Sequence, residues 1–140
     1  MDKKFQVVVF GKKGCEKCAS LNKRLDTILK KKEWQDFEKV YMDVHTEDGL
    51  IAFSKAECLN PQRIPAFVVV WKNSQNNALE PVPNPKMGQK DEVCGDARLH
   101  THLGLQTDYS GEGKGVISPK MIKQILQEAV AYGESLNRAA

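Results

Sequence analysis

The chain has 140 residues, of which 41% are apolar and 28% are charged, and its net charge is +3. These values are ordinary for a globular protein with one core, and they exclude disordered and fibrous proteins. No apolar run approaches the roughly 18 residues of a membrane span, and the short apolar stretch after Lys4 is too brief for a secretory signal. We therefore expect a cytoplasmic, monomeric protein of one domain over residues 1–140, with no membrane partner.

The positive charge is concentrated at the start of the chain. Residues 1–32 hold ten Lys and Arg against three Asp and Glu, whereas residues 33–140 hold eleven against fifteen. Lys23 and the lysines at 30–32 are interpreted as a solvated face. Nucleic acid is not an expected partner, because the overall charge is small and no aromatic residues interleave with the lysines.

The first half of the chain alternates between strand and helix patterns. Residues 7–10 form a continuous apolar run, typical of a strand buried on both faces. From Cys18 to about Lys32 the pattern predicts a helix, and residues 40–44 predict a second strand. The apolar positions of that helix fall on one face, at Leu21, Leu25, Ile28 and Leu29.

A second helix and a third strand follow. Thr46 is the expected N-cap of a helix over residues 46–59, which carries apolar side chains and ends at Asn60-Pro61. Residues 66–71 are rich in Val and aromatic side chains and predict the third strand. Trp71 at its end, and Trp34 earlier in the chain, are expected to pack on the core.

Residues 72–115 are predicted to be a loop-rich insertion, because they hold three of the six prolines and six of the ten glycines. Within them, residues 98–106 alternate enough to suggest a fourth strand, which Gly104 interrupts. After the insertion, Ser118 as N-cap and Pro119 as first helical residue introduce an amphipathic helix that we expect to stop before Gly133.

The most informative feature is the pair Cys15 and Cys18, which follows the first strand and opens the first helix. At such a junction the first sulfur meets the unpaired N–H groups of the helix start, which favour its thiolate. Lys12, Lys13 and Lys17 add positive charge and could attract an anionic partner. Cys15 is therefore expected to be the nucleophile, and Cys18, one turn deeper, to resolve the mixed disulfide.

Glu16 opposes this cationic effect. It is interpreted as a solvated acid at the helix start, with a role as proton acceptor for Cys18 as the alternative. Lys17 and Glu16 are thus the residues expected to tune the thiolate.

The order β, α, β, α, β, β, α with this cysteine motif resembles the thioredoxin superfamily. The segments Val7-Val8-Val9-Phe10-Gly11-Lys12-Lys13-Gly14-Cys15-Glu16-Lys17-Cys18, Tyr41-Met42-Asp43-Val44 and Arg63-Ile64-Pro65-Ala66-Phe67 look most like glutaredoxins and glutaredoxin-like thioredoxins. The resemblance implies an α/β thioredoxin-like fold with a mixed four-stranded sheet flanked by helices. It also implies that Pro65 is cis and lies against the cysteines.

The resemblance further implies a dithiol-disulfide oxidoreductase whose only redox group is the Cys15–Cys18 pair, with no other cofactor and no metal. Ile64, Pro65, Lys12 and Lys13 are the expected substrate-binding residues. A reductase or glutathione is the expected electron donor. Glutaredoxins carry a Gly-Gly-x-x-Asp segment that holds glutathione, and no equivalent is present here. We therefore expect a preference for disulfide-containing proteins as substrates.

Two other classes stay open: a thioredoxin-fold binding module without turnover, and a metal-binding protein. Two close cysteines supply half of a tetrahedral metal site. Candidate partners are Cys58, Cys94, His100 and His102. Cys58 is otherwise expected to be a small buried hydrophobe, and Cys94 an exposed thiol able to form an intermolecular disulfide. His45 is expected to be a polar surface group.

Overall fold

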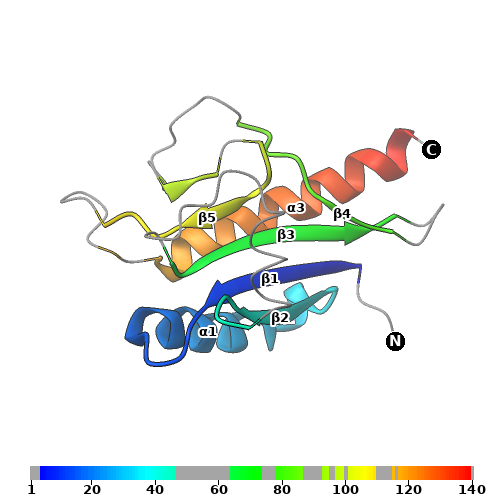
Figure 1. Cartoon of the computed structure of the whole chain (residues 1–140). Helices are drawn as coiled ribbons and strands as arrows, with labels where there is room; N and C mark the ends of the chain where they lie inside the picture. Colours follow the sequence, from blue (N-terminus) through cyan, green and yellow to red (C-terminus); the bar gives the residue numbers. More distant parts are fainter. Residues whose placement is uncertain are drawn as a thin grey trace.

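The computed structural model describes residues 4–46, 64–73, 78–86, 93–94, 97–99, 101–109, 115 and 117–139. Figure 1 shows a sheet with helices packed against it. In chain order the elements are β1 (Phe5–Gly11), α1 (Glu16–Leu29), a 3-10 turn η1 (Lys32–Trp34), β2 (Phe37–Asp43), β3 (Ala66–Lys72), β4 (Leu79–Pro81), β5 (Gly104–Gln106) and α3 (Pro119–Ala139). The helix expected after Thr46 lies outside the described residues.

The sheet is mixed and open, which confirms the predicted α/β class. Its path is β2, β1, β3, β4, with β1 parallel to β2 and antiparallel to β3. Beyond β3 the edge is shared by two short strands. Residues 66–68 of β3 pair with β5, and residues 70–72 pair with β4. Two short strands therefore occupy the place where a single fourth strand was expected.

The predicted strand over residues 98–106 is wrong in its extent, because the chain reverses within it. Leu99 N donates to Gly104 O at 3.0 Å, and Arg98 forms an isolated antiparallel β-bridge with Leu105. Only residues 104–106 join the sheet. At Gly104 an added Cβ would lie 3.0 Å from Cα of Val68 and closer still to the backbone of Phe67, so glycine is what lets β5 approach β3.

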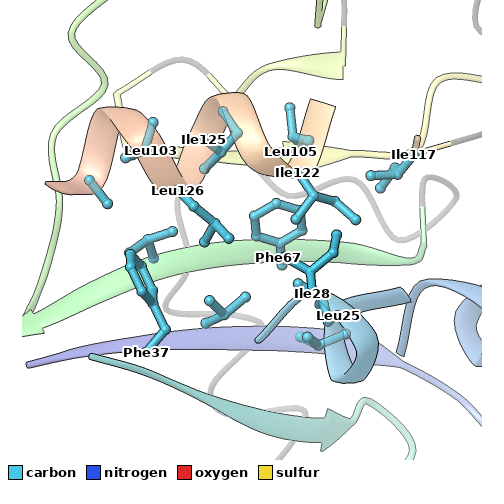
Figure 2. Close-up of a cluster of buried hydrophobic side chains, with 14 of the residues drawn as sticks. Leu25, Ile28, Phe37, Phe67, Leu103, Leu105, Ile117, Ile122, Ile125 and Leu126 are labelled. Carbon is cyan, nitrogen blue, oxygen red and sulfur yellow. The ribbon is translucent and has the colours of Figure 1, made fainter. Parts of the chain in front are cut away.

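Side chains from both helices meet on one face of the sheet. Phe67 of β3 projects between α1 and α3 (Figure 2). The alternating side chains of β1 and the 3-to-4-residue spacing in both helices supply apolar stripes to the same layer. The buried residues of this cluster include Phe5, Val7, Val9, Leu21, Leu25, Ile28, Ile122, Ile125, Leu126 and Ala129. Trp34 is buried against the ring of Phe37, and Trp71 packs on Tyr132.

The last helix starts as expected and ends later. Met121 N donates to the Ser118 hydroxyl at 3.3 Å, and Pro119 is the first helical residue. The helix does not stop before Gly133 but continues to Ala139. Gly133 is a packing residue: a Cβ there would lie 3.0 Å from the ring of Phe5. No helix in the described part of the chain is long and apolar enough to cross a membrane.

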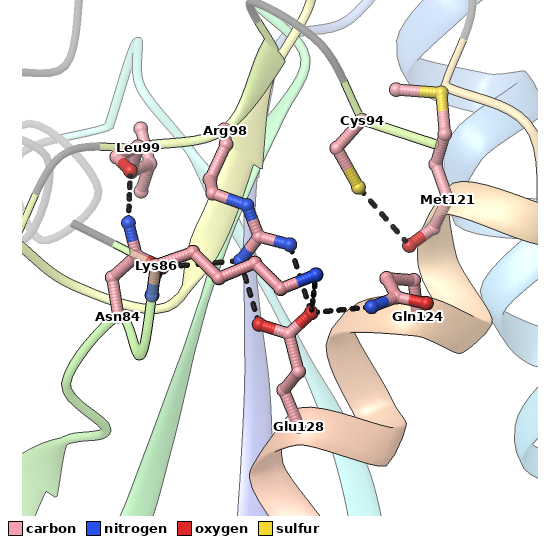
Figure 3. Close-up of polar contacts among 8 residues, drawn as sticks. All are labelled: Asn84, Lys86, Cys94, Arg98, Leu99, Met121, Gln124 and Glu128. Carbon is pink, nitrogen blue, oxygen red and sulfur yellow. Dashed lines mark hydrogen bonds and ion pairs between the residues drawn. The ribbon is translucent and has the colours of Figure 1, made fainter. Parts of the chain in front are cut away.

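A buried polar network ties the segment before β5 to α3 (Figure 3). Arg98 donates to both carboxylate oxygens of Glu128, at 2.7 and 2.8 Å. It also donates to Asn84, whose amide donates to the carbonyl of Leu99 at 2.9 Å. The predicted insertion is therefore anchored in its described parts.

Cys94 corrects an expectation. It is 4% exposed and belongs to the cluster between the sheet and the helices, with its Sγ 4.0 Å from Met121 O (Figure 3). The prediction that Cys94 is an exposed thiol able to form intermolecular disulfides is therefore wrong. Sequence context indicated a loop, and the loop folds back onto α3.

Candidate functional site

Cys15 lies at the N-cap of α1, just after β1 and a turn that contains Gly14 at φ +77°. This positive φ is one that glycine adopts without strain. The Cys15 Sγ accepts a hydrogen bond from Cys18 N at 3.2 Å, and in the reduced protein this N–H would stabilise a thiolate on the same sulfur. The helix begins at Glu16, two residues before the expected start, because the cysteine itself provides the cap.

Cys15 and Cys18 are joined by a disulfide, and their Cα atoms are 5.2 Å apart, an ordinary separation for such a bond. The two sulfurs differ in access. Cys15 is partly exposed, whereas Cys18 is 1% exposed. Cys18 belongs to a small cluster separate from the main core, with Phe10, Ile64, Val68 and Leu99. An incoming group can therefore reach the first cysteine more easily than the second.

The Ile64–Pro65 peptide bond is cis, as the resemblance implies. Ile64 lies in the same cluster as Cys18, and Pro65 faces α1 across a cavity of about 190 Å³. The backbone carbonyls of Ile64 and Pro65 both accept hydrogen bonds from the segment after β5. Tyr109 Oη donates to Ile64 O at 2.6 Å, and Thr107 donates to Pro65 O through its N–H at 3.1 Å and its hydroxyl at 2.5 Å.

The described residues between β5 and α3 thus lie beside the cis-proline and α1. Lys17 Nζ donates to Gly115 O at 3.0 Å and lies 5.4 Å from the centre of the Tyr109 ring. Arg24 donates to Ile117 O at 3.0 Å. Sequence reasoning missed Thr107 and Tyr109, because no motif marks them and their partners lie more than 40 residues away.

Tyr41 is another neighbour that the sequence did not indicate. An added Cβ on Gly11 would lie 2.5 Å from the Tyr41 hydroxyl and 3.1 Å from Cβ of Cys18, so the phenol crosses the end of β1 next to the cysteine turn. Burial raises the pKa of Tyr41, and the charge of Asp43 raises it further. The phenol is therefore neutral, and it can donate or accept a hydrogen bond.

The charged residues expected around the pair are placed on the surface. Lys12, Lys13, Glu16 and Lys17 are all exposed. Of these, Lys17 contacts the segment after β5. His45 is exposed, as expected for a polar surface group.

The proposed metal partners are not assembled in the described part of the chain. No group of three or more His, Cys, Asp and Glu side chains there could hold a metal ion. Cys94 lies in the main core, in a different cluster from Cys18. His102 forms an isolated backbone β-bridge with Pro83. Cys58 and His100 lie outside the described residues.

Comparison of the chain with protein-family models, with curated proteins and with solved structures gives no match. The chemistry of the site therefore has to be argued from its own geometry. A partly exposed sulfur at a helix start, bonded to a buried sulfur three residues later, is an arrangement that can exchange disulfides.

Proposed function

We propose that this protein is a thiol-disulfide oxidoreductase that uses the Cys15–Cys18 pair on disulfide-containing protein substrates. The observation that carries the proposal is the disulfide itself, placed at the N-terminus of α1 with the first sulfur accessible and the second buried. The helix start and the exposed lysines favour the thiolate of Cys15 in the reduced protein.

Reduction of a substrate takes two exchanges. The Cys15 thiolate attacks one sulfur of the substrate disulfide, which forms a mixed disulfide and releases the other substrate sulfur as a thiolate. Cys18, once deprotonated, then attacks the Cys15 sulfur, and the second substrate thiolate leaves. The substrate gains two electrons from the Cys15–Cys18 dithiol and two protons from solvent, and the Cys15–Cys18 disulfide is the oxidised product. A thiol or dithiol donor returns the pair to its reduced form.

Protein disulfides fit the surroundings of the pair better than glutathione. The carbonyls of Ile64 and Pro65 already accept hydrogen bonds from Tyr109 and Thr107. A tripeptide would have to compete for these groups with few further contacts, whereas a protein offers a wider surface. The chain also lacks the Gly-Gly-x-x-Asp segment with which glutaredoxins hold glutathione.

The test is reduction of insulin disulfides, run in parallel with thioredoxin reductase and with glutathione plus glutathione reductase. Wild-type protein should accelerate insulin reduction, and Cys15→Ser should abolish the acceleration. Cys94→Ser is the matched control, because that thiol is buried away from the pair and its removal should leave the rate unchanged. Equal rates for wild type and Cys15→Ser would overturn the proposal.

A further inference from the structure

A cationic groove runs between α1 and the beginning of α3. Its volume is about 420 Å³, and Pro119, the first residue of α3, forms part of its wall. Among the described residues, no acidic side chain lines it. Its polar lining consists of Ser20, Lys23, Arg24, Thr27, Lys31 and Lys123, so four of these six side chains are positively charged.

The four cations are not neutralised within the described part of the chain, where none of them is in an ion pair. Other cations do form ion pairs. Lys39 lies 2.5 Å from Asp26 on another side of α1, and Arg98 forms an ion pair with Glu128. Lys23 and Lys31 are exposed, as expected for a solvated face, and they line this groove together with Lys123 of α3. Unpaired charge of one sign along a groove attracts ligands of the opposite sign.

The groove adjoins the cavity at Pro65, whose neighbour Ile64 packs in the same cluster as Cys18. The cavity of about 190 Å³ next to Pro65 shares Ser20 and Arg24 with it, and its wall includes Lys17. Between Lys17 and Ile28, α1 advances about 16 Å at 1.5 Å per residue. An extended peptide covers that distance with about five residues. The cationic surface is therefore long enough for a short chain and too long for a single phosphate or carboxylate.

We propose that this groove binds an acidic segment adjacent to the disulfide of the protein substrate, an inference that rests on the proposed oxidoreductase function. Acidic side chains would pair with Lys23, Lys31 and Lys123 while the substrate disulfide lies at Cys15. Nucleic acid fits less well, because none of the described residues that line the groove is aromatic and could stack on bases.

The first experiment measures binding apart from redox chemistry. A fluorescent Glu-rich peptide without cysteine is titrated with oxidised protein, and anisotropy is recorded at low and at physiological salt. The test variant is Lys31→Glu/Lys123→Glu. The matched control is Lys30→Glu/Lys32→Glu, which changes the net charge equally at positions that do not line the groove. We expect at least about a tenfold loss of affinity for the test variant and less than threefold for the control, with wild-type binding weakened by salt.

The second experiment compares reduction of two peptide disulfides, one flanked by Glu and one by Gln, with the uncharged substrate hydroxyethyl disulfide. Wild type should reduce the Glu-flanked peptide at least about tenfold faster than the Gln-flanked one. In the test variant that preference should disappear, while the rate with hydroxyethyl disulfide stays within twofold of wild type.

The outcomes separate the two proposals. Peptide binding that depends on Lys31 and Lys123, without reduction of any disulfide, would overturn the redox function and the role of the peptide as substrate, leaving only an acidic-peptide site. Reduction of all three disulfides without preference for Glu would overturn the groove alone. Equal loss of binding in both double variants, or tighter binding of a single-stranded oligonucleotide of equal charge, would also overturn the groove as a peptide site.

Discussion

The hydroxyl of Tyr109 donates a hydrogen bond to the carbonyl of Ile64, 45 residues earlier, at 2.6 Å. The same ring lies 5.4 Å from the ammonium of Lys17, two residues after Cys15. Tyr109 therefore contacts both the cis-proline turn and the start of α1. A substrate that pairs with the carbonyl of Ile64 would compete with Tyr109 for that oxygen.

Tyr109→Phe tests this competition. The variant keeps the ring beside Lys17 and frees the carbonyl of Ile64. One hydrogen bond contributes about 0.5–1.5 kcal/mol, so we expect KM for a peptide disulfide to fall by about two- to tenfold, with kcat unchanged. Tyr132→Phe is the control, because Tyr132 packs against Trp71 away from the cysteines. An unchanged or higher KM would show that substrate does not bind at Ile64.

Single-cysteine variants separate the roles within the pair. Because Cys15 is partly exposed and Cys18 is 1% exposed, Cys18→Ser should trap mixed disulfides with substrate and Cys15→Ser should trap few. Trapped complexes are counted on non-reducing gels and the linked residue is identified by mass spectrometry. Equal trapping by both variants would mean that both sulfurs are accessible in the reduced protein.

Gly11→Ala probes the close contact between the end of β1 and the cysteine turn. The added methyl would lie 3.1 Å from Cβ of Cys18 and 2.5 Å from the Tyr41 hydroxyl. Overpacking of this kind costs about 1–3 kcal/mol of unfolding free energy, which urea unfolding measures. In a Tyr41→Phe background the nearest atom is gone, so the cost should be smaller. Identical costs in both backgrounds would place the strain elsewhere.

Arg98→Met tests the buried ion pair with Glu128. The side chain of Arg98 is 3% exposed and that of Glu128 is 11% exposed, so the variant leaves a carboxylate nearly buried without its main partner. We expect a loss of about 3–5 kcal/mol. Lys86→Met is the control, since its ammonium is 3.9 Å from Glu128 and more exposed, and it should cost less than about 1 kcal/mol. Similar losses in the two variants would contradict a dominant role for Arg98.

Local sequence determined the elements around the cysteine pair. The apolar run of β1, the helical spacing of Leu21, Leu25 and Ile28, and the Val-rich β3 each have a periodicity that identifies the structure without knowledge of its partners. The position of Cys15 at the strand-helix junction follows from the same pattern. Ser118 and Pro119 likewise mark the start of α3, because capping depends on adjacent residues.

Only the tertiary structure decided what surrounds these elements. The contact of Tyr109 with Ile64, the ion pair of Arg98 with Glu128 and the burial of Cys94 each join residues at least 27 positions apart. A local pattern carries no information about which distant segment will cover a given side chain. The same holds for Gly133, which lies inside α3 and packs closely against the ring of Phe5. It also holds for the cationic groove, whose lysines come from α1, the turn after it and α3, which packing brings together.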